Sequence, residues 1–258
     1  MDVVIDNLTI DEVRRIAEQY LSSHRFHHIV TPGPEFLLES SANPEFKRIL
    51  SHSDLSLADG VGLNFAALMS QQRFPHRITG VDFTEELLKI TAFRHARIFL
   101  FGGKTGVAEK AAIEIKSQHP GVVMAGYESG FRGPWQKMYD TQLIRKIHIA
   151  RPDILLVGLG APKQELWIDQ HRRDLHRVGI VMGVGRTLDY IARVITRPPA
   201  AWRRSGFEWL YTYLHANQFN QQIGHQSAIR RQRVKNATLH FMIEVIKHTN
   251  AKPHRNSR

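Results

Sequence analysis

Residues 152–167 read PDILLVGLGAPKQELW, and this stretch decides the fold class. Its first half, DILLVGLG (153–160), is an aliphatic run typical of a buried strand, and its two glycines indicate a tight turn. The segment that follows, PKQELWIDQHRRDLH (162–176), has the length and pattern of a helix. Strand, glycine turn and helix in this order form one unit of a parallel α/β sheet.

The same unit recurs along the chain. Further helical stretches are TEELLKITAFRH (84–95), TGVAEKAAIEIKSQH (105–119) and TLDYIARVI (187–195). This alternation predicts an α/β fold: a Rossmann-like, doubly wound, mostly parallel sheet covered by helices on both faces. The other strand candidates are HHIVT (27–31), DLSLA (54–58), ARIFLF (96–101), VVMAGY (122–127) and GIVMGVG (179–185).

Glycines and single polar residues gather directly after the predicted strands. In parallel α/β sheets ligands bind beyond the carboxyl ends of the strands, where helix starts offer free N–H groups to anions. Any single tight turn needs glycine and a polar cap, but five such loops together favour a site for a nucleotide-like, phosphate-bearing ligand. The loops are Thr31 with PGPE, Asp59 with GVG, GGKTG (102–106), GAPKQE (160–165) and GVGRTLD (183–189).

The composition is that of a soluble globular protein. The 258 residues are 42% hydrophobic and 23% charged, which suffices for one α/β domain with an appendage. No stretch approaches the roughly 18 consecutive apolar residues of a membrane span, and the N-terminus is acidic where a signal peptide is basic. The chain has no cysteine, which is compatible with a reducing compartment. We therefore expect a cytoplasmic protein.

The positive charge lies at the C-terminal end. Residues 203–258 hold ten Lys and Arg against two acidic residues, so they carry eight of the eleven surplus positive charges of the chain. We expect an α/β domain over residues 1–202 and a basic helical appendage over residues 203–258. A cationic appendage suits nucleic acid, an anionic membrane surface or a phosphorylated lipid, and it also suits a merely solubilising tail.

Familiar nucleotide and metal motifs are absent from the sequence. The Gly-Lys-Thr of GGKTG would need a glycine at position 98 to form a P-loop, and the chain has Ile98 there. No Gly-x-Gly-x-x-Gly follows the first strand, which argues against a nicotinamide cofactor. His24 and His28 have metal-pair spacing, but they straddle a helix end and a strand start. No Asp-x-Asp pair is present, so we expect no cofactor and no metal site.

The edge motifs, taken in order, resemble the WecG/TagA/CpsF family, glycosyltransferase family 26. The motifs are TPGPEF, ADGVG, RITGVDF, FGGKTGVAEKA, PDILLVGLGAPKQELW, MGVGRTLDY and RPPAAWRRSGFEWLY, and the resemblance runs from about residue 10 to about residue 214. The resemblance implies inverting transfer from a UDP-sugar donor to a polyprenyl-diphosphate-linked sugar acceptor, without a metal bound by Asp-x-Asp, at the cytoplasmic membrane face during assembly of surface polymers. It also implies self-association and no binding of nucleic acid.

The catalytic residues are then expected at Asp59 and Arg77. An acceptor hydroxyl needs a base, and Asp59 matches the family's essential aspartate in the ADG motif. Its alternative role is to cap a helix that begins near Val61. Arg77 matches the arginine of the family's R-x-TG-x-D string and is expected to contact the donor diphosphate. Asp82 more plausibly caps its own helix with Glu85, and it is the fallback base.

The substrate-binding residues are expected in the glycine loops and at the start of the appendage. Gln164 and Asp189 match family positions near the donor, whereas Trp167 is expected in the core. The family often has an asparagine at the position of Gly33 and a small residue at that of Arg186, so these two departures put the sugar specificity, and even turnover, in doubt. The full set is Thr31, Gly33, Gly102, Gly103, Lys163, Gln164, Gly185, Arg186, Asp189, Arg203 and Arg204.

The sequence leaves two interpretations of the appendage open, and three of the function of the whole chain. The stretch FEWLYTYLHANQF places Phe207, Leu210, Tyr211 and Leu214 on one helical face, which suits an anionic bilayer or packing on the body equally well. The basic run at residues 229–235 comes later than in the family. Besides the enzyme reading, the sequence allows a catalytically impaired assembly module and a basic nucleic-acid-binding protein.

Overall fold

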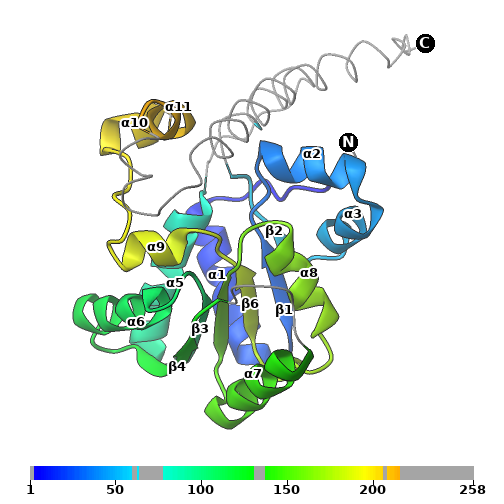
Figure 1. Cartoon of the computed structure of the whole chain (residues 1–258), viewed down its shortest axis with the longest axis vertical. Coiled ribbons are helices and arrows are strands. Elements are labelled where there is room, and N and C mark those ends of the chain that lie inside the picture. The colour runs from blue at the N-terminus through cyan, green and yellow to red at the C-terminus, as the bar shows by residue number, and fades with distance from the viewer. Residues whose placement is uncertain (1–2, 60–62, 64–77, 131–136, 206–207, 216–258) are drawn as a thin grey trace.

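Six parallel strands form one sheet at the centre of the molecule. Figure 1 shows the computed structural model, which describes residues 3–59, 63, 78–130, 137–205 and 208–215. The sheet has the order β2-β1-β6-β5-β3-β4, and each neighbouring pair is parallel. All six predicted strands are confirmed, and so is the α/β, Rossmann-like class. The strands are β1 (His27–Val30), β2 (Leu55–Ser56), β3 (Arg97–Gly102), β4 (Val123–Glu128), β5 (Ile154–Gly158) and β6 (Ile180–Gly183).

Helices connect the strands and cover both faces of the sheet (Figure 1). Each predicted helical stretch contains an observed helix, although α8 and α9 end earlier than the sequence pattern indicates. The helices are α1 (Ile10–Ser23), α2 (Pro34–Ala42), α3 (Pro44–Ser51), α5 (Gly80–Arg94), α6 (Val107–Gln118), α7 (Lys137–Ala150), α8 (Lys163–Gln170), α9 (Thr187–Ile191), α10 (Ala200–Ser205) and α11 (Glu208–Leu214). The predicted division after Trp202 stays a prediction; α10 spans that position, and residues 216–258 lie outside the described residues.

The core has two layers because successive residues of a strand point to opposite faces. On β3, Ile98 and Leu100 pack toward α1, α5, α6 and α9, while Phe99 and Phe101 pack toward α7 and α8. The same alternation runs along β5 and β6. Continuous aliphatic runs are what a sheet covered on both faces requires, and this explains why the strands could be found in the sequence.

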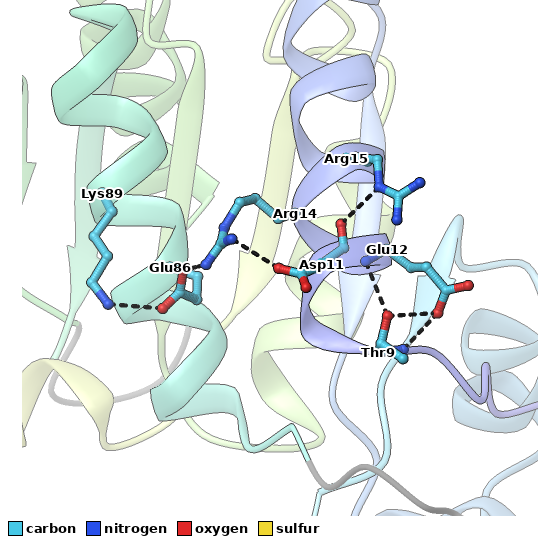
Figure 2. A network of polar contacts seen from close by, with 7 residues as sticks. All are labelled: Thr9, Asp11, Glu12, Arg14, Arg15, Glu86 and Lys89. Carbon is cyan, nitrogen blue, oxygen red and sulfur yellow. Dashed lines mark hydrogen bonds and ion pairs between the residues drawn. The ribbon is translucent and has the colours of Figure 1, made fainter.

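A polar network fixes the start of α1 and connects it to α5 (Figure 2). The N-cap Thr9 and Glu12 form a reciprocal capping box, in which Thr9 N donates to Glu12 Oε2 at 2.7 Å. Arg14 donates to Glu86 of α5 at 2.6 Å. Burial alone would raise the pKa of Glu86, but hydrogen bonds from Lys89 and Arg14 outweigh it and leave the pKa below its ordinary value. The network therefore holds α5 beside α1.

The carboxyl ends of β3, β5 and β6 lie level with one another. Gly102 is in register with Gly158, and Val157 is in register with Gly183. Gly103 N donates to Gly158 O at 2.9 Å. The glycine loops that follow these three strands therefore leave the sheet side by side, as the sequence pattern predicts.

Candidate active site

Asp59 follows β2 and is held between two other segments of the chain. Its backbone N donates to Pro32 O at 2.9 Å, and its Oδ2 accepts from Gly80 N, the first residue of α5, at 3.0 Å. A carboxylate at a helix N-terminus meets free N–H groups and the positive end of the helix dipole, so this position favours the ionised side chain. Asp59 therefore contributes to the N-terminus of α5, 21 residues away; residues 60–62, where its expected local cap would lie, are outside the described residues.

Thr31 lies near this carboxylate, and Gly33 lies against the backbone of Asp59. A Cβ placed on Gly80 would meet Thr31 Oγ1 at 3.0 Å and Asp59 Oδ2 at 3.5 Å. A Cβ placed on Gly33 would meet Asp59 O at 3.1 Å. The loops after β1 and β2 and the start of α5 thus converge on Asp59, and small residues allow the approach. The structure therefore brings together three separate segments: the loop with Thr31 and Gly33, Asp59 after β2, and Gly80 at the start of α5.

Gln164 connects the loops after β5 and β6. Its side chain is buried, and its Oε1 accepts from Gly160 N at 3.0 Å and from Gly185 N at 2.9 Å. Its Nε2 donates to Glu165 Oε1 at 2.7 Å. Two backbone donors on Oε1 fix which side of the amide is oxygen. Gln164, predicted as a substrate-binding residue, therefore organises two of the predicted donor loops.

Glu165 is a buried acid beside this glutamine. The pKa of Glu165 is raised to about 8, because burial, helped by the negative charge of Glu35 on α2, outweighs the hydrogen bonds from Gln164 and from the backbone that lower it. The Glu165 side chain is 1% exposed. It is therefore protonated at neutral pH and acts as a neutral hydrogen-bonding group.

A stability measurement checks this protonation state. The pKa of Glu165 is 4.5 ordinarily and about 8 in the folded chain, so between these pH values the folded chain binds more protons than the unfolded chain. The free energy of unfolding then falls as pH rises through this window, by up to about 1.4 kcal/mol per pH unit from this group. We expect Glu165→Gln to be more stable relative to the natural chain at pH 8 than at pH 5, measured by urea unfolding. An equal difference at both pH values would contradict the assignment.

Asp189 lies in a positive environment at the start of α9. Burial raises the pKa of Asp189 above its ordinary value, while the charges of Arg186 and Lys104 act to lower it. Lys104 belongs to the loop after β3 and Arg186 to the loop after β6, so cations from two loops lie near one carboxylate. Asp189 is the third residue of α9 and Arg186 is its N-cap position. This pair of cations suits a diphosphate.

The sequence prediction for Asp82 is wrong in one respect. Thr79, not Asp82, is the N-cap of α5: Asp82 N donates to Thr79 Oγ1 at 3.1 Å, and Thr79 Oγ1 donates to Asp82 Oδ2 at 2.7 Å. Thr79 is in extended conformation three residues before Asp82, which allows this reciprocal pair. Asp82 also accepts from Arg197 Nη2 at 2.8 Å.

Arg197 connects the start of α5 to the C-terminal helices. Besides Asp82, its guanidinium lies 3.8 Å from Glu208 Oε1 on α11. The contact joins the helix that binds Asp59 to the segment that carries Arg203. Arg203 lies in α10 and is partly buried.

Four further residues were assigned from the sequence, and none of them takes part in the contacts described above. Arg77 lies outside the described residues, and Arg204 stays a prediction. Lys163 is exposed at the first position of α8. Trp167 is confirmed as a core residue, 2% exposed, and its Nε1 donates to Asp140 Oδ1 at 3.0 Å.

Three residues near the site were missed in the sequence. Glu165 stands in the quoted string PKQE, Lys104 in GGKTG and Arg197 in RPPAAW. Lys104 could have been recognised as a cation in a glycine loop after a strand, but the GGKTG string was compared only with the P-loop motif. Nothing in the local sequence marks Glu165 as buried or Arg197 as a partner of α5.

The described residues form neither a metal-type cluster nor a membrane-spanning helix. Over residues 3–59, 63, 78–130, 137–205 and 208–215, no group of three or more His, Asp or Glu side chains is placed to hold a metal ion. His24 is the C-cap of α1 and His28 lies in β1, as expected. In the part of the chain that the structure describes, every helix is too short or too polar to span a bilayer.

Comparison with known proteins gives the family. The model of the "Glycosyl transferase WecG/TagA/CpsF family" matches residues 1–217. Curated relatives named N-acetylglucosaminyldiphosphoundecaprenol N-acetyl-beta-D-mannosaminyltransferase, from Staphylococcus aureus strains NCTC 8325 and MRSA252, are 27% identical over 216 residues, which is 83% of this chain and 83% of each relative. The match covers the sheet and every loop of the site. The chain belongs to the WecG/TagA/CpsF family and is a glycosyltransferase.

Proposed function

We propose that this glycosyltransferase moves a sugar from a UDP-sugar to a polyprenyl-diphosphate-linked sugar, with inversion and without a divalent cation, in the assembly of a surface polysaccharide or teichoic acid. The relatives' names specify an N-acetylglucosaminyl-diphosphoundecaprenol acceptor and an N-acetylmannosaminyl group. The observation that carries the proposal is the position of Asp59, a half-buried carboxylate held at the N-terminus of α5 beside Thr31. The donor sugar is of N-acetylmannosamine type, a uronic acid or a hexose.

Asp59 acts as the general base. The acceptor hydroxyl attacks the anomeric carbon of the donor, the bond from that carbon to the UDP oxygen breaks, and the hydroxyl proton passes to the carboxylate of Asp59. A hydroxyl is a weak nucleophile at neutral pH, so a positioned base is worth about 10²- to 10⁴-fold in rate. The hydrogen bond from Gly80 N holds one oxygen of this carboxylate in place.

Cations and glycine loops stabilise the leaving UDP. Lys104 and Arg186 act on Asp189 from two loops, and Arg77 is the further arginine that the family pattern assigns to this role. Fixed positive groups at the point where charge develops replace the metal that an Asp-x-Asp site would hold. Gly185, where a Cβ would meet nothing within 4 Å, allows the donor to approach the backbone closely, whereas Gly102 and Gly103 are required by close contacts with Gly158 and Val107.

The appendage brings the site to the membrane. Arg203, Arg204 and the basic residues of 229–258 suit the diphosphate of the acceptor and the anionic inner face of the cell membrane. We therefore place the enzyme at that face as a peripheral protein, and self-association is part of the proposal.

A liposome measurement tests the appendage. We expect the full chain to bind vesicles rich in anionic lipid and to be released by salt, because juxtamembrane basic residues contribute about 1 kcal/mol each. A chain ending at Trp202 should bind at least tenfold more weakly. Neutral vesicles are the control. Equal binding of both chains would contradict the membrane role.

Part of the apolar helical face predicted for residues 207–214 packs within the protein, because the Tyr211 ring lies 5.6 Å from the ring of Trp202. Leu214 of the same face is exposed.

A donor panel tests the reaction. The full chain is offered UDP-N-acetylmannosamine, UDP-N-acetylglucosamine, a UDP-hexose and a UDP-hexuronic acid, each with a short-chain polyprenyl-diphosphate-N-acetylglucosamine acceptor. We expect one donor to give an acceptor product heavier by one sugar, detected by mass spectrometry. Absence of a product with every UDP-sugar, while the same mixture turns over with a known relative, would refute the proposed donor class.

A further inference from the structure

Glu165 is the third residue of α8 and is the most deeply buried acid near the glycine loops. Its side chain is 1% exposed. Oε1 accepts from Gln164 Nε2 at 2.7 Å, while Oε2 is buried without a hydrogen-bond partner among the described residues. An ionised carboxylate in such a place would lose its hydration with little compensation. A protonated, neutral acid loses much less hydration energy on burial, so the geometry favours the neutral form of Glu165.

The backbone of β6 presses on this acid and its neighbour. A Cβ placed on Gly183 would lie 2.5 Å from Glu165 Oε1 and 2.4 Å from Gln164 Nε2. No side chain other than hydrogen fits between β6 and the two side chains. The hydrogen bond between Gln164 and Glu165 therefore lies directly against the strand, at a position where only glycine fits.

The charged groups around Glu165 do not stabilise an anion. From α2, Glu35 contributes a negative charge that disfavours ionisation. From β6, the residues on either side of Gly183 are Met182 and Val184, which carry no charge. From α3, Arg48 is paired with Asp169 of α8. Burial raises the pKa of Glu165 to about 8, in agreement with this arrangement.

The acid determines the orientation of the Gln164 amide. With Nε2 directed at Glu165 Oε1, the amide oxygen faces Gly160 N and Gly185 N. Those two amides belong to the loops after β5 and β6, at the edge where the donor is expected. An apolar residue at position 165 would leave Nε2 without this acceptor, and the amide could then turn.

We propose that Glu165 is a positioning residue of the donor site: as a neutral carboxylic acid it holds Gln164 in the orientation that joins the loops after β5 and β6. It does not touch the donor. The link to catalysis rests on the proposed function, because it assumes that these loops bind the UDP-sugar. The proposed effect of Glu165 on the two loops does not rest on that function, because it is measured on the protein without substrate.

Two variants and two readouts test the proposal on the full chain. Glu165→Gln keeps an acceptor oxygen and cannot ionise, whereas Glu165→Leu removes the acceptor. The first readout is hydrogen–deuterium exchange at the Gly160 and Gly185 amides of the free protein, from pH 6 to pH 10. The second is KM for the UDP-sugar and kcat over the same range.

Ionisation of Glu165 does not itself break the hydrogen bond from Gln164, but it places an unhydrated charge at a buried site, which is relieved only when water enters at the start of α8. We therefore expect the natural chain to lose amide protection and to raise KM at least tenfold as pH passes about 8, with a smaller change in kcat. Glu165→Gln should keep protection and KM near their neutral-pH values throughout. Glu165→Leu should lose at least tenfold in amide protection and should raise KM at least tenfold at every pH. Glu35→Gln, on the exposed surface, should move the alkaline change of the natural chain to lower pH, because it removes a charge that disfavours ionisation.

The proposal is overturned if Glu165→Leu keeps both amides protected, or if Glu165→Gln shows the same alkaline change as the natural chain. If Glu165→Leu does not fold, the pH profile of Glu165→Gln decides alone. If no variant turns over any UDP-sugar, the proposed function fails, and the exchange readout still decides the role of Glu165.

Discussion

Asp59→Asn is expected to lower the rate of UDP release by about 10²- to 10⁴-fold, the amount that a general base contributes. Asparagine has nearly the same shape and keeps an oxygen that accepts from Gly80 N, but it cannot take a proton from the acceptor. The free energy of unfolding should change by no more than about 1 kcal/mol, the typical worth of a helix-end contact. Steady-state kinetics and urea unfolding on the same preparation separate the two effects.

Asp82→Asn is the matched control. Asp82 lies in α5 two residues after Gly80, the hydrogen-bond partner of Asp59, and it contacts Thr79 and Arg197. Its loss removes an ion pair and part of a reciprocal cap, so we expect a change in stability of about 1 kcal/mol and a rate within a few-fold of the natural chain. A large loss of rate in Asp82→Asn with none in Asp59→Asn would move the base to Asp82.

Gly102→Ala is expected to destabilise the chain by about 3–5 kcal/mol. The φ angle of Gly102 is +130°, and a Cβ there would lie 2.5–2.6 Å from the backbone of Gly158 on the neighbouring strand. Both strands would have to separate at the edge that carries the donor loops. Strain at such a φ and overpacking each cost about 1–3 kcal/mol. Urea unfolding measures the loss, and KM for the donor should rise as well.

Gly106→Ala isolates the conformational part of this effect. Gly106 has a φ of +81°, but a Cβ there meets nothing within 4 Å. Only the strain of the left-handed conformation remains, about 1–2 kcal/mol. If the two alanine variants were equally stable, the contact between Gly102 and Gly158 would not limit the structure.

The class of the fold could be predicted because the sheet is buried on both faces. Such strands need continuous aliphatic residues, and ILLV (154–157) and IVM (180–182) show this pattern directly. The order of the strands could not be predicted, because it depends on which connections cross the sheet. The end of α8 was also misplaced: the pattern of 162–176 is helical, whereas the helix ends at Gln170.

The site could be predicted in part for a similar reason. Loops that follow parallel strands meet at one edge, so Asp59, Thr31 and Gln164 could be assigned there from the sequence. The hydrogen bond from Gly80 to Asp59 could not, because it depends on where α5 begins. Burial of Glu165 and the contact of Arg197 with Asp82, 115 residues apart, are tertiary effects that no local pattern reveals.

The central claim is that the chain releases UDP only by transferring the sugar, with fixed protein charges in place of a metal. The most direct test measures UDP release by the full chain in EDTA, with and without the polyprenyl-diphosphate-sugar acceptor. We predict release that requires the acceptor and proceeds at the same rate in EDTA as in Mg²⁺. Release at an unchanged rate without acceptor, or release that stops in EDTA and returns with Mg²⁺, would contradict the account.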